Sequence, residues 1–220
     1  MIRELLPEGV AAVEVRGDDP DGGLLPEEEA VLDRASEKRR REFATGRSCA
    51  RRALAELRFP PAPILPGPDR EPSWPPGAVG SITHCRDYCA AAVAPASRFS
   101  SIGIDAEVHD ELPEGVLERI SLPEERAWLE ARAGDGTRWE TVLFSAKESV
   151  FKAWFPLARR WLGFEDARVE LAPSGTFHAR LLVPGPAIRG RRVTGFDGRY
   201  LVRDGLVLTA VVVPGWPTPS

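Results

Sequence analysis

The sequence predicts an α+β protein that folds as one compact domain or as two tightly joined halves. Its 220 residues are enough for one core to bury about 70% of the unfolded chain's surface. Segments with the patterns of strands and of helices follow one another in blocks along the chain. The octapeptide LPEEEAVL at 25–32 is echoed by LPEERAWL at 122–129, and a longer helical segment follows each. The echo predicts two related halves, with coincidence as the alternative because L-P-E-E is a common helix opening.

The first hundred residues are expected to hold three strands and two helical segments. Pro26 opens a helix, because proline fits the first turn and the three acids behind it complement the helix dipole. A long helix is predicted over 36–57, with a break near Ser36. The eight prolines of 59–77 predict a loop. The strands are predicted over 9–16, 78–84 and 88–94.

The remaining residues are expected to hold one strand, two helices and a run of strands. The first strand is SIGIDAE at 101–107, and Ser121 is expected to cap the next helix. A strong helix is predicted from Arg138 to Phe155, ended by Pro156. The last strands are predicted over 167–171, 176–183, 191–203 and 206–213.

Composition limits the class of protein. Lys and Arg number 29 and Asp and Glu 33, so the net charge is −4, which argues against general nucleic-acid binding but allows a local anion site. No apolar run approaches the roughly 18–20 residues of a membrane span, and the acidic start MIRELLPEGV is no signal peptide. Three cysteines are too few for a disulfide scaffold. We therefore expect a cytoplasmic protein that binds neither nucleic acid nor membrane.

Asp105 and Glu107 end an apolar strand. Residues two apart in a strand point to the same face, so both carboxylates leave the sheet on one side. The alternative is a strand that reaches the surface and exposes two solvated acids, and the pair taken alone favours it.

Glu148 and Lys152 are two charges within the apolar helix WETVLFSAKESVFKAWF at 139–155. At about 100° per residue, one stripe of the helix forms a core face. This stripe consists of Leu143, Ala146, Val150, Ala153 and Trp154. The side with the two charges also carries Phe144, Phe151 and Phe155, whereas a solvated face with a simple salt bridge would not. Embedded charges must pair or bind something, so the pattern favours a site.

A cation would explain the three carboxylates of Asp105, Glu107 and Glu148 if they converge. Like charges about 5 Å apart repel by roughly 3 kcal/mol per pair at an effective dielectric constant of about 20. Hard oxygen ligands with room for water and phosphate suit Mg²⁺. The sequence thus predicts a metal site that handles phosphate.

Basic residues concentrate between residues 38 and 58 of this acidic chain. They are Lys38, Arg39, Arg40, Arg41, Arg47, Arg51, Arg52 and Arg58. Arg39, Phe43 and Arg47 recur every four residues and share one helix face. A solvated helix with spread charge is the alternative for each arginine, but the density favours an anion site, because guanidinium groups suit phosphate.

Thr83 and His84 end the segment GSITH at 80–84. A histidine here can hold a phosphate or act as a base, although a single histidine at a strand end is more often only hydrogen-bonded. Together with Cys85 and Cys89 it does not make a convincing zinc site, because a second pair of ligands is missing.

Three of these segments together resemble the Sfp/EntD-type 4′-phosphopantetheinyl transferases. They are GSITH at 80–84, GIDAE at 103–107 and FSAKESVFKAW at 144–154, in the family's order and at about its spacing. REFATGRSCARRAL at 41–54 is similar to the family's N-terminal helix. Further segments look closest to the EntD-like subgroup, namely PPAPILPG, EPSWP, KAWFPLARRWLGFED and RDGLVLTAVVV.

The resemblance implies an enzyme that moves 4′-phosphopantetheine from coenzyme A onto a serine of an apo acyl or peptidyl carrier protein. The second product would be adenosine 3′,5′-bisphosphate. Family members of this size are monomers of two pseudo-symmetric α+β halves, each a small sheet packed with helices, with the active site in the cleft between them. The expected boundary gives an N-terminal half of residues 1–100 and a C-terminal half of residues 101–220.

Residue by residue, the resemblance gives Asp105, Glu107 and Glu148 as ligands of Mg²⁺, with Mn²⁺ as a substitute. Glu148 would also take the serine proton, directly or through a water molecule, and Lys152 would steady the charge on the phosphoryl group. The residues implied to bind coenzyme A are Arg39, Arg47, Thr83, His84, Asp105, Lys147 and Lys152.

One segment departs from the family pattern, and two other functions stay open. Relatives often carry a lysine in the loop before E-P-x-W, where this chain has Pro66, and Arg70 is the candidate replacement. The carboxylates and Lys152 would also suit a Mg²⁺-dependent nuclease. The arginine-rich helix would suit a non-enzymatic module that docks nucleic acid or an acidic protein.

Overall fold

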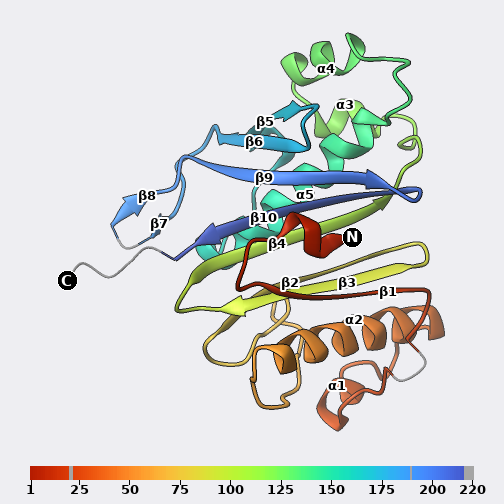
Figure 1. The fold of residues 1–220 in the computed structure, drawn as a ribbon, viewed down its shortest axis with the longest axis vertical. Helices are drawn as coiled ribbons and strands as arrows, with labels where there is room; N and C mark the ends of the chain where they lie inside the picture. Colours follow the sequence, from red (N-terminus) through yellow and green to blue (C-terminus); the bar gives the residue numbers. More distant parts are fainter. Residues whose placement is uncertain (20–21, 189, 216–220) are drawn as a thin grey trace.

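Two antiparallel β-sheets lie side by side and divide the chain into an N-terminal and a C-terminal half (Figure 1). The structure is a computed structural model and describes residues 1–19, 22–188 and 190–215. The halves meet where strand β2 (Ala78–Cys85) of the first sheet runs beside strand β4 (Phe99–Val108) of the second. The α+β prediction is confirmed.

The N-terminal half is a three-stranded sheet with a long helix across one face. Its strands lie in the order β1-β3-β2. Besides β2, the elements of this half are the short helix η1 (Ile2–Leu5), β1 (Ala11–Arg16), α1 (Pro26–Ala30), α2 (Glu37–Glu56) and β3 (Tyr88–Pro95). The chain breaks before α2 as predicted, because the Ser36 hydroxyl accepts a hydrogen bond from the Arg39 backbone N–H and caps the helix.

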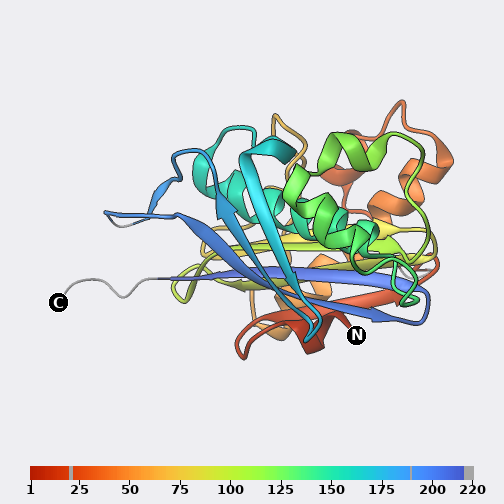
Figure 2. The same cartoon turned by 90° about the horizontal axis from the view of Figure 1, so that it is seen from above.

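The C-terminal half is a five-stranded sheet of order β4-β10-β9-β6-β5. Helix α5 (Trp139–Ala158) covers one face of this sheet, and η1 lies on the opposite face (Figure 2). The remaining elements are α3 (Val116–Ile120), α4 (Pro123–Glu130), η2 (Phe164–Asp166), β5 (Ala167–Ala172), β6 (Thr176–Leu181), β7 (Ala187–Ile188), β8 (Arg191–Arg192), β9 (Gly195–Arg203) and β10 (Leu206–Pro214).

The two halves repeat one topology. In the first half the opening strand β1 pairs with the closing strand β3, and β2 lies beyond it; in the second, β4 pairs with β10, and β9 lies beyond it. Each opening strand is followed by a short helix that begins at the proline of L-P-E-E, and then by a 20-residue helix. The C-terminal half adds the hairpin β5–β6 at its far edge. This correspondence agrees with the internal echo of the sequence.

Three predicted boundaries are wrong. Helix α5 continues through Pro156 to Ala158, because a proline disturbs the turn before it more than the turn after it. Ser121 ends α3 instead of capping α4, whose N-cap is Leu122 with the Glu125 carboxylate bound to its backbone N–H. The strand predicted over 191–203 is interrupted, and its two parts are β8 and β9. No helix among the described residues is long and apolar enough to cross a membrane.

Candidate active site

Two hydroxyl groups join the halves at the side of β4 that faces β2. The other side of β4 forms a regular ladder with β10, so its outward N–H groups need partners elsewhere. The Ser81 hydroxyl accepts from the Ile104 N–H at 3.1 Å, and the Thr83 hydroxyl accepts from the Ala106 N–H at 3.0 Å. These bonds fix β2 against β4 and so place the end of β2 beside Asp105.

Asp105 is the centre of a buried polar cluster at this junction. Its side chain is only 4% exposed. Oδ1 accepts from Lys152 Nζ at 2.7 Å and from the Thr83 hydroxyl at 3.3 Å. Oδ2 is fully buried and has no partner among the described residues. A buried carboxylate oxygen without a donor is costly, so this atom is suited to receive a ligand.

Glu107 and Glu148 lie next to Asp105. Both are half-buried, and among the described residues neither accepts a hydrogen bond or forms an ion pair within 4 Å. Burial, followed by the nearby Asp105 carboxylate, raises the pKa of Glu107 to about 7 and also raises the pKa of Glu148. The structure therefore brings the three predicted carboxylates into one electrostatic cluster.

The donor set of this cluster fits a hard divalent cation. It offers carboxylate oxygens of Asp105, Glu107 and Glu148, one of them buried and unpartnered. Within the described part of the chain, no three acidic, histidine or cysteine side chains already stand close enough together to enclose a metal ion. The Glu107 and Glu148 side chains would have to turn toward Asp105 Oδ2 to do so.

The packing of α5 on β4 puts Glu148 and Lys152 in reach of the cluster. The predicted core stripe of α5 is buried. A Cβ atom on Gly103 would lie 1.9 Å from the Ser149 carbonyl oxygen, so only glycine allows the helix to approach this closely. The Ser101 hydroxyl donates to the Ala153 carbonyl oxygen at 2.7 Å and fixes the register of helix on strand.

Arg47 presents a buried cation on the N-terminal side. It is 7% exposed, its Nε donates to the Ile64 carbonyl oxygen at 2.7 Å, and its guanidinium lies over the Phe43 ring at 3.9 Å. No carboxylate of the described residues lies within 4 Å of it. Burial lowers the pKa of Arg47 to about 10; the Glu28 carboxylate opposes this shift, and Arg39 adds to it through repulsion. A buried guanidinium without a carboxylate partner suits a phosphate.

His84 ends β2 next to the same helix. Desolvation lowers the pKa of His84; the Glu42 carboxylate opposes this shift, and the positive charges of Arg39 and Lys152 add to it. Arg39 therefore acts electrostatically on both His84 and Arg47. A cavity of about 560 Å³ opens at His84, and its charged lining mixes Lys38, Arg41 and Arg86 with Asp18, Glu42 and Asp87.

Lys147 is a predicted site residue whose charge is paired away from the Asp105 cluster. Its ammonium lies 2.8 Å from the Glu125 carboxylate and donates to the Phe164 carbonyl oxygen at 2.8 Å. Burial lowers the pKa of Lys147, and Glu125 opposes this shift.

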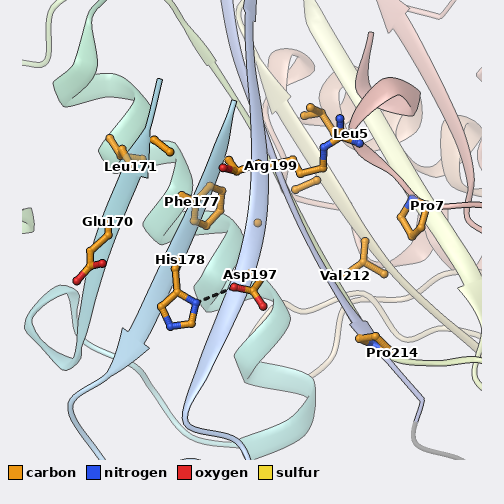
Figure 3. Close-up of a pocket in the computed structure, with 14 residues that line it drawn as sticks. Leu5, Pro7, Glu170, Leu171, Phe177, His178, Asp197, Arg199, Val212 and Pro214 are labelled. Carbon is orange, nitrogen blue, oxygen red and sulfur yellow. Dashed lines mark hydrogen bonds and ion pairs between the residues drawn. The ribbon is translucent and has the colours of Figure 1, made fainter. Parts of the chain in front are cut away.

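Of two further cavities, one is lined by a predicted site residue and the other is not. One of about 690 Å³ lies between the halves, and Ser81, Lys152 and Trp161 are among its lining residues. A larger cavity of about 810 Å³ lies on the outer face of the C-terminal sheet, where His178 Nδ1 contacts Asp197 Oδ1 at 2.7 Å (Figure 3). It contains none of the predicted site residues.

Comparison with known proteins decides the family. A family model for the 4′-phosphopantetheinyl transferase N-terminal domain matches residues 27–94, and one for the 4′-phosphopantetheinyl transferase superfamily matches residues 101–202. The 4′-phosphopantetheinyl transferase Svp of Streptomyces mobaraensis is 52% identical over 219 residues, which cover 97% of this chain and 89% of Svp. The chain belongs to the 4′-phosphopantetheinyl transferase superfamily.

Two further relatives are similar over most of the chain. Npt of Nocardia iowensis is 48% identical, covering 96% of this chain and 99% of Npt. Enterobactin synthase component D of Salmonella typhimurium is 34% identical over 80% of this chain and 73% of its own length. The family expected from the sequence is confirmed, and the protein is an enzyme of this class. The EntD-type relatives match at lower identity than Svp and Npt.

Sequence reasoning missed two residues that build the candidate site. Ser81 and Gly103 stand inside the recognised segments, but their contacts become visible only when β2, β4 and α5 are placed together. In the loop that lacks the expected lysine, Pro66 pairs with Pro72 in an isolated bridge. Arg70 lines the cavity between the halves together with Lys152.

Proposed function

We propose that the protein transfers the 4′-phosphopantetheine group of coenzyme A to a serine of an apo carrier protein in a Mg²⁺-dependent reaction that releases adenosine 3′,5′-bisphosphate. The observation that carries this proposal is the Asp105 cluster, which lies between the halves with an unpartnered carboxylate oxygen. Membership of the superfamily weighs against the nuclease and the non-enzymatic docking module. The net charge of −4 weighs against general nucleic-acid binding.

We assign the phosphate groups of coenzyme A to Arg39, Arg47 and His84. The 560 Å³ cavity at His84 has room for the nucleotide end. From there β2 leads through Thr83 to Asp105, so the pyrophosphate would reach the carboxylate cluster. The pantetheine arm would then lie along Phe151 and Trp161, whose rings pack 4.6 Å apart at the edge of the cavity between the halves.

The proposed transfer needs charge neutralisation and one proton acceptor. Asp105, Glu107 and Glu148 would hold Mg²⁺, which when bound neutralises charge on the pyrophosphate. The serine oxygen forms a bond to the phosphorus that bears the pantetheine arm. The bond from that phosphorus to the bridging oxygen breaks, and the bisphosphate leaves. Glu148 takes the serine proton, and Lys152 stabilises the charge on the phosphoryl oxygens.

The proposal is tested by incubating the protein with coenzyme A, Mg²⁺ and a panel of apo carrier proteins, and by reading the carrier mass. We expect at least one carrier to gain one phosphopantetheine group, and Asp105→Ala to abolish the gain. Asp110→Ala, at an exposed acid beyond the same strand, is the matched control and should behave as the wild type. Transfer that proceeds in excess chelator would contradict the metal site.

A further inference from the structure

Each half contains one buried glutamate in the same structural position. Glu28 follows the L-P-E opening of α1 and is 0% exposed, and Glu125 follows the L-P-E opening of α4 and is 4% exposed. Each accepts a hydrogen bond from the N-cap residue of its own helix, at 3.0 Å from Leu25 and at 2.7 Å from Leu122. A buried carboxylate is retained only where strong donors surround it.

The two glutamates also hold equivalent partners in the rest of each half. Glu28 pairs with Arg51 of α2 and accepts from the Ile64 N–H at 2.9 Å. Glu125 pairs with Lys147 of α5 and, in the equivalent place, accepts from the Val169 N–H at 2.7 Å. Each carboxylate therefore ties the short helix, the long helix and a following segment together.

The N-terminal set has one contact that the C-terminal set lacks. The carbonyl oxygen of Ile64, the residue that Glu28 holds through its N–H, accepts the hydrogen bond from Arg47 Nε at 2.7 Å. Ile64 is fully buried, so its peptide groups cannot exchange these partners for water. In the C-terminal half, no arginine among the described residues donates to the Val169 carbonyl. The contacts thus run from Glu28 through Ile64 to the Arg47 guanidinium.

We propose that Glu28 is a positioning residue, which fixes the Arg47 guanidinium for the phosphate groups of coenzyme A through the backbone of Ile64. This inference rests on the proposed function for its ligand. The contacts with Ile64 and Phe43 orient the Arg47 guanidinium, and no other hydrogen bond from it is found among the described residues, so its terminal N–H groups can meet phosphate oxygens. Because a bidentate contact depends on angle, a loose Ile64 would weaken binding even with the Arg47 charge in place.

The variant Glu28→Gln tests the positioning role. Gln keeps the size of the side chain but replaces one carboxylate oxygen by an NH₂ group, which cannot accept a hydrogen bond. The backbone N–H groups of Ile64 and Leu25 can therefore no longer both be bound. Glu125→Gln, which disturbs the same arrangement in the other half, is the matched control. Glu28→Asp keeps the charge and replaces Glu28→Gln if that variant fails to fold.

The first measurement is solvent exchange of the Arg47 Nε–H by NMR spectroscopy, which needs no ligand. We expect slow exchange in the wild type and in Glu125→Gln, and fast exchange in Glu28→Gln. Equal protection in all three folded proteins would overturn the proposal, whatever the enzyme binds.

The second measurement is a double-mutant cycle for coenzyme A affinity by calorimetry. Glu28→Gln should raise the Kd about tenfold in the wild-type background and have no further effect in an Arg47→Ala background. Equal effects in both backgrounds would show that Glu28 does not act through Arg47. If the wild type itself fails to bind coenzyme A, the proposed function is wrong, and the exchange of Arg47 Nε–H still decides whether Glu28 positions this side chain.

Discussion

Thr83→Val is the most informative single change at the junction of the halves. The hydroxyl of Thr83 accepts from the Ala106 N–H at 3.0 Å, donates to Asp105 Oδ1 at 3.3 Å and accepts a longer bond from Lys152 Nζ at 3.4 Å. Valine has nearly the same shape but no hydroxyl, so it removes all three bonds without creating a cavity. The buried Ala106 N–H then has no partner.

The expected loss follows mainly from the two shorter bonds, to the Ala106 N–H and to Asp105 Oδ1. A buried donor without a partner costs about 1–3 kcal/mol, and a hydrogen bond to a charged group contributes about 1.5–3 kcal/mol. Because the bond from Thr83 to Asp105 is long, at 3.3 Å, we assign it the lower end of the second range. We therefore expect Thr83→Val to lower the free energy of unfolding by about 3 kcal/mol. Thr83→Ser keeps the hydroxyl and loses one methyl group, which costs about 1 kcal/mol.

Urea unfolding of the three proteins measures this difference, with the same slope m required in each. Transfer activity should follow the same order, because Asp105 loses one of the two side chains that orient it. Equal stability of Thr83→Val and Thr83→Ser would refute the reasoning, because the methyl group and not the hydroxyl would then account for the effect.

Four further changes test other parts of the structure. Arg47→Ala and His84→Ala should each raise the KM for coenzyme A about ten- to a hundredfold and leave the KM for the carrier nearly unchanged in steady-state assays. A rise in the KM for the carrier instead would assign the arginine-rich helix α2 to carrier docking. Burial raises the pKa of Glu14, but hydrogen bonds from the chain amino group, Tyr88 and the Ile2 N–H outweigh this and lower the pKa overall. The contribution of Glu14 to the free energy of unfolding is therefore present above a pH of about 4.5 and is lost as the pH falls through the folded-state pKa. The difference in unfolding free energy between wild type and Glu14→Gln should thus shrink below that pH, and a constant difference would contradict the assignment. Trp161 is 74% exposed, so Trp161→Ala should leave thermal unfolding unchanged but raise the KM for coenzyme A; an unchanged KM would remove it from the pantetheine path.

The order of elements and the candidate site were largely predictable from the sequence, because they depend on local pattern. The apolar stripe of α5 predicted its core face, and Glu148 and Lys152 stood out because phenylalanines surround them. The spacing of Asp105 and Glu107 predicted a common face. The L-P-E-E echo predicted two related halves, and the matching strand orders agree with it.

The contacts that make the site work depend on long-range packing and were not predictable. Ser81 and Thr83 replace a strand ladder between the halves, which no local pattern reveals. Lys147 was grouped with the coenzyme A contacts, but its place in the buried pair with Glu125 depends on how α4 meets α5. The continuation of α5 past Pro156 to Ala158 was likewise not predicted.

The central claim is that carboxylates of the C-terminal half and cations of the N-terminal half form one substrate site through a divalent cation. Calorimetric titration of coenzyme A, with Mg²⁺ and with chelator, tests it most directly. The account predicts that Mg²⁺ tightens binding in the wild type and makes no difference in Asp105→Ala, which lacks the unpartnered oxygen. Wild-type affinity that is the same with Mg²⁺ and with chelator would contradict the claim.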